Sequence, residues 1–356
     1  MIIAADALTR FAEAIIAGTG SQPAEAREVA THLVEANLKG HDSHGVGVIP
    51  GYVKYFKEGR LKPNQHATLV SETGPIAVFD GQMGYGQVTA REATEWAIAK
   101  AKSIGVGIFA LRNTHHVARV GTYGELAAAS GLVSIHFVNV MLAPGRVAPF
   151  GAIGGRFGTN PICITFPSAP NSKDGGKPPV VLDFATSRVA AGKLRVAMNE
   201  GKEFPPGYLI DAEGNDATRP AVFYRENGAM LPFGEHKGSG LALACELMAG
   251  VLTGGGAMQA SFPNHGIKNG MFSIVLDPAR FGDTGWMERE AATLIDWVKS
   301  SPRRPGVDEV MIAGDPERKS REKRLKSGIP VDANTWKELI DAAGQVGVPA
   351  AQIPQG

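Results

Sequence analysis

The sequence predicts an α/β protein, with a sheet in the middle of the chain and a helical domain built from both of its ends. Two patterns indicate this architecture. Short runs rich in β-branched and aromatic residues alternate with helical segments through the middle of the chain, and helical spacing of apolar residues dominates the two ends. We therefore expect a helical domain of residues 1–75 plus 285–356 and an α/β domain of residues 76–284.

Apolar side chains recur at helical spacing in the first sixty residues, in one segment from Leu8 to Ile16 and in another from Val29 to Leu38. The chain becomes helical again near its other end. Trp286 to Val298 and Ala333 to Ala343 have helical patterns, and a short extended run, Glu309 to Ile312, lies between them. We expect the C-terminal segment to pack back on the N-terminal helices.

The middle of the chain carries the predicted strands and the helices that cover them. The strand-like runs are Thr68 to Phe79, Val106 to Leu111, Leu132 to Val138, Ile162 to Phe166, Val180 to Leu182 and Met271 to Leu276. The helical segments are Ala90 to Ile104, Tyr123 to Ser130 and an apolar helix from Lys237 to Leu252. The last of these ends at Gly254-Gly255-Gly256. The polar stretch from Ser168 to Pro179 predicts an exposed loop.

Composition excludes several classes of partner. The 36 Lys and Arg residues against 35 Asp and Glu leave a formal net charge of +1, so the chain has no basic field for nucleic acid or an anionic membrane. It has neither a long apolar run nor a secretory leader. Cys163 and Cys245 lie in apolar runs, which predicts buried, reduced thiols. These features predict a cytoplasmic protein.

Two histidine-bearing segments indicate an enzyme. They are Asp42-Ser43-His44-Gly45 and, about seventy residues later, Asn113-Thr114-His115-His116. Histidine is the side chain whose ordinary pKa lies between pH 5 and 8, so two such loops with polar neighbours favour proton-transfer chemistry.

The glycine signature of an ordinary dinucleotide-binding fold is missing. Gly45-Val46-Gly47 has Pro50 at its third glycine position, and the glycines between 151 and 158 are wrongly spaced. A glycine-rich turn from Gly154 to Pro161 precedes an apolar strand instead. Its backbone N–H groups are able to cradle a phosphate, although such a turn is more often only a turn.

Six motifs together resemble the malate/L-lactate dehydrogenase family, which also contains ureidoglycolate dehydrogenase, sulfolactate dehydrogenase, 2,3-diketogulonate reductase and piperideine-2-carboxylate reductase. The resemblance runs from about residue 5 to 345. The motifs are Asp42 to Val46, Asn113-x-His115-His116, Gly158-Thr159-Asn160-Pro161, Leu182 to Ser187, Gly192-Lys193 and His236-Lys237-Gly238. The resemblance implies a non-Rossmann NAD(P)-binding sheet domain, a homodimer, and hydride transfer between nicotinamide C4 and C2 of a 2-hydroxy or 2-oxo acid. NAD is the expected cofactor, with NADP as the alternative.

The resemblance also implies roles for individual residues. His116 is the expected acid/base and His44 is the second family histidine; the sequence leaves the choice between them open. Ser43 and Tyr52 lie close to His44 in the sequence as candidate substrate-binding residues. Arg119 is a candidate partner for a substrate carboxylate, with a protein salt bridge as the alternative. His115 is expected to support its neighbour.

One departure from the family concerns the substrate. Relatives often carry an arginine at the position of Val48 or of Gly51, and this chain has neither. Because a guanidinium suits a carboxylate, its loss indicates a substrate with a different distal group or an arginine supplied from elsewhere.

The residues expected at the cofactor fall into four groups. They are a turn, a strand end, a helix start and a Gly-Asp pair at a position where relatives have Gly-Glu. Together they would supply backbone donors, a ribose acceptor and positive charge for the pyrophosphate. They are Gly158, Thr159 and Asn160; Asp183, Phe184 and Ala185; His236 and Lys237; and Gly314 and Asp315.

Other functions remain open on the sequence. One is reduction of a cyclic imino acid or a diketo sugar acid. A metal-dependent hydrolase would use His41, Asp42, His44, His115 and His116, but adjacent histidines on a strand point to opposite faces and we expect no metal. A third is a dinucleotide-binding protein without turnover. Tightly bound metal would favour the hydrolase, and NADH binding without turnover would favour the binding protein.

Overall fold

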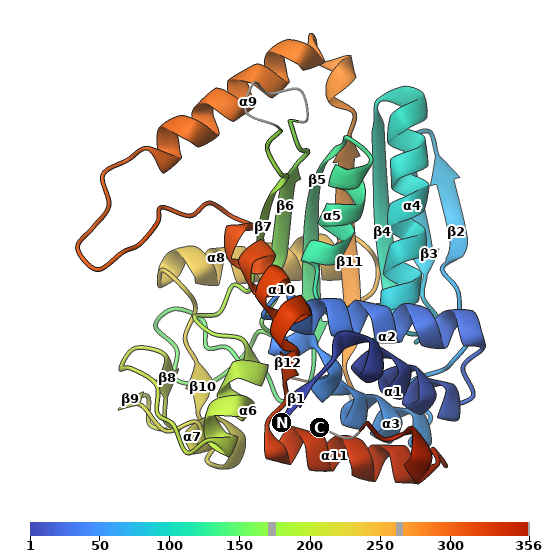
Figure 1. The fold of residues 1–356 in the computed structure, drawn as a ribbon, viewed down its shortest axis with the longest axis vertical. Coiled ribbons are helices and arrows are strands. Elements are labelled where there is room, and N and C mark those ends of the chain that lie inside the picture. Colours follow the sequence, from blue (N-terminus) through green and yellow to red (C-terminus); the bar gives the residue numbers. More distant parts are fainter. Residues whose placement is uncertain (170–175, 261–265, 355–356) are drawn as a thin grey trace.

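A computed structural model describes residues 1–169, 176–260 and 266–354, and it confirms the α/β prediction (Figure 1). A seven-stranded sheet has the order β2-β3-β4-β11-β5-β6-β7. In this sheet β3 and β4 are parallel, and the other neighbouring strands pair antiparallel. The strands are β2 (Thr68–Thr73), β3 (Ile76–Asp80), β4 (Val106–Thr114), β5 (Val133–Met141), β6 (Ile162–Phe166), β7 (Val180–Phe184) and β11 (Lys268–Leu276).

Helices cover both faces of this sheet. Figure 1 shows α4 (Gly86–Ile104) and α5 (Gly121–Ala129) in front of the strands and α8 (His236–Cys245) behind them. The core between the sheet and the helices α4 and α5 contains Phe109, Tyr123, Val138 and Met271, all buried. The cysteines Cys163 and Cys245 are buried free thiols. None of the helices in the described residues is apolar over a length that would cross a bilayer. The cytoplasmic location stays a prediction.

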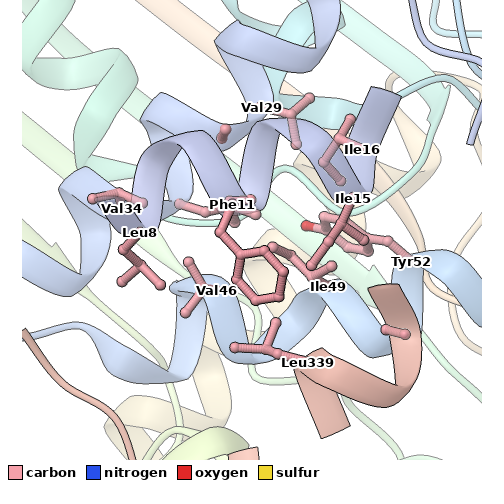
Figure 2. Packing of buried hydrophobic residues seen from close by; sticks show 14 of the residues in the cluster. Leu8, Phe11, Ile15, Ile16, Val29, Val34, Val46, Ile49, Tyr52 and Leu339 are labelled. Atoms are coloured by element: carbon pink, nitrogen blue, oxygen red, sulfur yellow. The ribbon is translucent and has the colours of Figure 1, made fainter. Parts of the chain in front are cut away.

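The helical layer is formed from both chain ends. It contains α1 (Ala5–Gly18), α2 (Pro23–Leu38), α3 (Ile49–Lys57) and α11 (Ala333–Gln345), and Figure 2 shows Phe11, Ile49 and Leu339 packed against one another. The N-terminal strand β1 (Ile2–Ile3) pairs with β12 (Ile329–Pro330). The predicted packing of the C-terminal segment on the N-terminal helices is therefore confirmed for α11.

Three predicted elements need correction. The run Thr68 to Phe79 is a hairpin, because Gly74 turns the chain at φ 56° between β2 and β3. The apolar helix from Lys237 changes after Cys245 into a π-helix, Glu246–Val251. The run Glu309 to Ile312 is not a strand; instead, the Ile312 N–H donates to Asp315 Oδ2 at the start of a helix.

That helix, α10 (Asp315–Ser327), was not predicted because it lacks an apolar face. Only Asp315 in it is buried. Ion pairs hold it: Arg321 contacts Glu35 on α2, and Arg324 contacts Asp42. Charge complementarity thus takes the place of the apolar stripe that usually marks a packed helix.

A small subdomain beside the main sheet was also not predicted. It has a three-stranded sheet, and its strands are too short to give a period-two signal. The elements are α6 (Ala191–Asn199), β8 (Leu209–Ile210), β9 (Asp216–Ala217), α7 (Ala221–Arg225) and β10 (Ala229–Met230). Val147, Leu194, Phe223 and Met230 lie in its core.

The domain limits at residues 75–76 and 284–285 stay a prediction. One helix placed in the predicted helical domain, α9 (Thr284–Lys299), lies at the far end of the sheet from α1, α3 and α11 (Figure 1). Ala292 is its buried residue, and Trp286 and Trp297 are exposed. Six residues of the predicted loop from Ser168 to Pro179, residues 170–175, lie outside the described residues.

Gly107 sets how closely α4 approaches the sheet. A Cβ on this β4 residue would lie 2.2 Å from the Ala97 carbonyl oxygen and 2.8 Å from its Cα. Because the obstacle is helix backbone, Gly107→Ala should lower the free energy of unfolding by about 1–3 kcal/mol. Gly344→Ala in α11 is the matched control, because no atom lies near its added methyl. Urea unfolding of both variants measures the difference; equal midpoints would contradict the packing argument.

Candidate active site

The sheet order creates a cavity at one end of the strands. Because β11 runs antiparallel to both β4 and β5, these two strands end at the same edge, where β6 and β11 begin and β7 ends. A cavity of about 840 Å³ opens there, bordered by Ser43-His44 and by the start of α6. This volume is typical of a small-molecule site.

His116 follows the end of β4 and lines this cavity. Its Nδ1 lies 2.8 Å from the Tyr52 hydroxyl, which in turn accepts a hydrogen bond of 2.8 Å from Gln87 Nε2. The Tyr52 ring is buried in the core of the helical layer (Figure 2). Burial and the nearby His44 lower the pKa of His116 well below its ordinary value, so its imidazole is neutral at pH 7.

His44 lies beside His116 on the same cavity wall. The two rings stack with their centroids 5.7 Å apart, and Ser43 Oγ lies 3.1 Å from His44 Nδ1. Burial, followed by the charges of His41 and Arg119, lowers the pKa of His44 to about 4. Asp42 fixes this turn because it accepts hydrogen bonds from Asn37 and Arg324. The structure therefore brings both sequence-predicted histidines together as neutral imidazoles.

His115 points away from the cavity. It is buried between Tyr52 and Tyr55, with ring centroids 5.5 Å and 5.3 Å away, and neither ring nitrogen has a hydrogen-bond partner in the described residues. Burial lowers its pKa to about 3. Its place behind His116 matches the supporting position expected from the sequence; the role itself stays a prediction.

Arg119 faces carboxylates of the protein. Its side chain is 1% exposed, with Glu125 3.0 Å and Asp183 3.5 Å away. The Gly121 N–H donates to Asp183 at 2.8 Å. Burial raises the pKa of Asp183, and the Arg119 charge opposes this shift. Both side chains reach the cavity wall, so their expected contacts with substrate and ribose stay predictions.

The other expected cofactor residues divide into two sets. Gly158, Thr159, Phe184 and Ala185 line the cavity together with Asp183. Those that do not are Asn160, His236, Lys237, Gly314 and Asp315; the substrate-binding candidate Tyr52 does not line it either. Asn160 instead accepts from the Val140 N–H and donates to Glu246, and Asp315 is ion-paired with Lys299 and Arg318.

Three cations on the cavity wall had no role assigned from the sequence: Arg146, Arg188 and Lys193. None of them has a carboxylate ion pair within the part of the chain that the structure describes. Arg146 lies over Phe223, with 5.0 Å from its guanidinium carbon to the ring centroid. Lys193 reaches the cavity because Gly192 packs on Ser43, where a Cβ would be 2.4 Å from the Ser43 Cβ. Only the fold reveals this approach.

The charges at the cavity suit the phosphates of a nicotinamide dinucleotide. Cations without carboxylate partners face it, and Arg119 Nε and Nη2 are buried there without a hydrogen-bond acceptor among the described residues. The N-terminus of α6 borders it as well, and helix N-termini favour anions. Across residues 1–169, 176–260 and 266–354, no group of three or more His, Cys, Asp or Glu side chains is placed to hold a metal ion.

Known proteins match this chain over nearly its full length. The family model described as malate/L-lactate dehydrogenase matches residues 3–340. Hydroxycarboxylate dehydrogenase B of Escherichia coli is 43% identical over 351 residues, which cover 97% of this chain and 94% of that protein. An L-lactate dehydrogenase of Cupriavidus necator is 37% identical, with 91% of each chain covered.

The solved structure of sulfolactate dehydrogenase from Methanocaldococcus jannaschii superposes with a TM-score of 0.86 at 31% identity, over 99% of both chains. The agreement thus extends from the sequence motifs to the whole fold, including the helical layer and the small subdomain. The chain belongs to the malate/L-lactate dehydrogenase family.

Proposed function

We propose that this protein is an NAD(P)-dependent 2-hydroxy acid dehydrogenase, with NAD as the preferred cofactor. The observation that carries the proposal is a neutral imidazole, His116, held by Tyr52 on the wall of a cavity where three cations have no carboxylate partner among the described residues. Membership of a family whose relatives are named for hydroxycarboxylate and lactate oxidation supports the same activity.

A bound nicotinamide would accept or supply a hydride at its C4. In oxidation, His116 Nε2 takes the proton of the substrate hydroxyl as the hydride leaves C2, so that the C–O bond becomes a carbonyl. In reduction, the same nitrogen returns the proton to the oxygen on C2. One nitrogen thus accepts the proton in one direction and returns it in the other. His44, stacked on His116, borders the same space with Ser43.

The substrate carboxylate needs a positive partner, and Val48 and Gly51 provide none. Lys193 is the best placed alternative, because it is exposed in the cavity next to Ser43 and carries no ion pair among the described residues. Arg188 and the N-terminus of α6 are then available for the cofactor phosphates. Malate-like and lactate-like acids are the first candidates, and cyclic imino acids or diketo sugar acids are the alternative.

We also propose that the protein acts as a homodimer. Several large apolar side chains are exposed on neighbouring elements, which is typical of an interface. Ile164 on β6 pairs with Leu182 on β7, and both are exposed. Leu243, Leu247, Val251 and Leu252 form a second exposed group along α8 and the π-helix. A second copy of the chain would cover these side chains.

The acid/base assignment is tested by His116→Gln. Turnover of NADH with 2-oxo acids should fall by about 10²–10⁴-fold, because the positioned proton donor is gone, while NADH binding persists. His44→Gln is the matched comparison and should lose less. Initial rates and NADH fluorescence titration measure both. A larger loss in His44→Gln would reverse the assignment, and a wild-type protein inactive across all acids would refute the proposed activity.

The pH dependence of kcat/KM follows from the lowered pKa of His116. Oxidation needs the neutral imidazole, which persists well below pH 6.5. The rate should therefore stay level from pH 8 to about 6 and fall only in more acidic buffer. Reduction needs the protonated form and should rise as the pH falls. Rate profiles in both directions measure this; an acid limb centred near the ordinary histidine pKa would contradict the burial argument.

The dimer is tested by the double variant Leu247→Glu, Leu252→Glu. Wild type should have twice the chain mass by light scattering, and the variant should shift toward one chain because two desolvated charges oppose the interface. Leu325→Glu on α10 is a control with similar exposure at a different surface. A wild-type monomer, or a variant that stays dimeric, would refute this surface as the interface.

A further inference from the structure

We propose that Gln87 is a positioning residue that decides, through Tyr52, which ring nitrogen of His116 carries the proton. The inference rests on the proposed function in one respect: His116 is taken as the acid/base. Its physical content, the tautomer of one imidazole, is measurable without substrate or cofactor.

Three buried groups form one chain of hydrogen bonds. Gln87 Nε2 lies 2.8 Å from Tyr52 Oη, and Tyr52 Oη lies 2.8 Å from His116 Nδ1. Gln87 is fully buried and Tyr52 is 1% exposed, so no solvent competes for these bonds. Gln87 Oε1 has no hydrogen-bond partner within the described residues.

Packing fixes the positions of Gln87 and Tyr52 in this series of hydrogen bonds. Gln87 lies in the first turn of α4, whose first residue, Gly86, is so close to the histidine loop that a Cβ would be 2.5 Å from the His116 carbonyl oxygen. The Tyr52 ring is fixed by the core of the helical layer. The three polar groups therefore cannot separate without moving one of the two cores; only their protons and the orientation of the Gln87 amide are free to rearrange.

The hydroxyl of Tyr52 has a single hydrogen, which couples the two hydrogen bonds. When the amide nitrogen of Gln87 donates to Tyr52, the hydroxyl donates onward to His116 Nδ1. The imidazole then carries its proton on Nε2 and is a donor toward the cavity. When the amide oxygen faces Tyr52, the hydroxyl donates to Gln87 and accepts from His116 Nδ1–H. Nε2 then offers its lone pair to a substrate hydroxyl.

The two arrangements differ by a half-turn of one amide, whose ends have nearly the same shape. In each of them Tyr52 satisfies one end of the amide and leaves the other without a partner, so the amide itself favours neither. The neutral base for oxidation needs the second arrangement, in which its proton lies on Nδ1. The imidazolium also needs the second arrangement, because both of its nitrogens are donors.

Two substitutions should shift the position of the His116 proton in opposite directions. Gln87→Met keeps the length and removes both hydrogen-bonding ends, so Tyr52 donates to His116 Nδ1 to avoid an orphaned hydroxyl. The proton of His116 then moves to Nε2 and its pKa falls further. Gln87→Glu, when ionised, only accepts. Tyr52 then donates to Glu, His116 holds its proton on Nδ1, and its pKa rises.

The test is ¹⁵N NMR of histidine-labelled protein at neutral pH, with the His116 signal identified by its loss in His116→Gln. Nδ1 should be unprotonated in Gln87→Met and protonated in Gln87→Glu, with wild type between them. The acid limb of kcat/KM should move to lower pH in the first variant and to higher pH in the second. kcat of Gln87→Met should fall at least about tenfold, with the KM for the cofactor unchanged.

Two controls separate positioning from folding. Thr94→Val removes a buried side-chain hydrogen bond elsewhere in α4 and should leave tautomer and pH profile unchanged. In a Tyr52→Phe background the relay is already broken, so Gln87→Met should add nothing. Folded variants with the same His116 tautomer, or pH limbs that move together, would overturn the inference. If wild type turns over no acid, the proposed function fails, but the NMR result still decides the role of Gln87.

Discussion

The hydrogen bond between Tyr52 and His116 joins the core of the helical layer to the edge of the sheet. Tyr52 belongs to α3 and is surrounded by side chains from both chain ends, whereas His116 follows a central strand of the sheet. The position of the imidazole therefore depends on the distance between the helical layer and the sheet edge. Residues far from the cavity, such as Phe11 and Leu339, contribute to the position of this ring through the packing around Tyr52.

Electrostatics at the site depends on keeping histidines neutral. His32, His44, His115 and His116 are all shifted to low pKa, mainly by burial. The positive charge that remains lies on Arg119 and on the cavity cations, so anions are attracted while the imidazoles keep a free lone pair. A substrate carboxylate would bring negative charge next to His116 and raise its pKa, which ties proton affinity to occupancy of the cavity.

Much of this arrangement was predictable. The strand-like runs at 106–111, 132–138, 162–166 and 271–276 all became strands, because β-branched residues recur in short stretches bounded by turns. The two histidine segments were predicted to work together, and they meet at one cavity wall. The elements that the sequence did not predict are mostly short or polar. They are the two-residue strands of the small subdomain, the hairpin turn at Gly74 and the charged helix α10. Gln87 gave no signal at all, because one glutamine in an amphipathic helix has no pattern until its partner is known.

Helix α10 shows where natural variation is constrained. It has no apolar face to preserve, so its positions without contacts to other elements are free to change provided that they stay helical. Arg321 and Arg324 are different, because they meet Glu35 and the Asp42 that braces the turn before His44. In related chains these arginines and their acidic partners should vary together, as coupled pairs, while the residues between them drift.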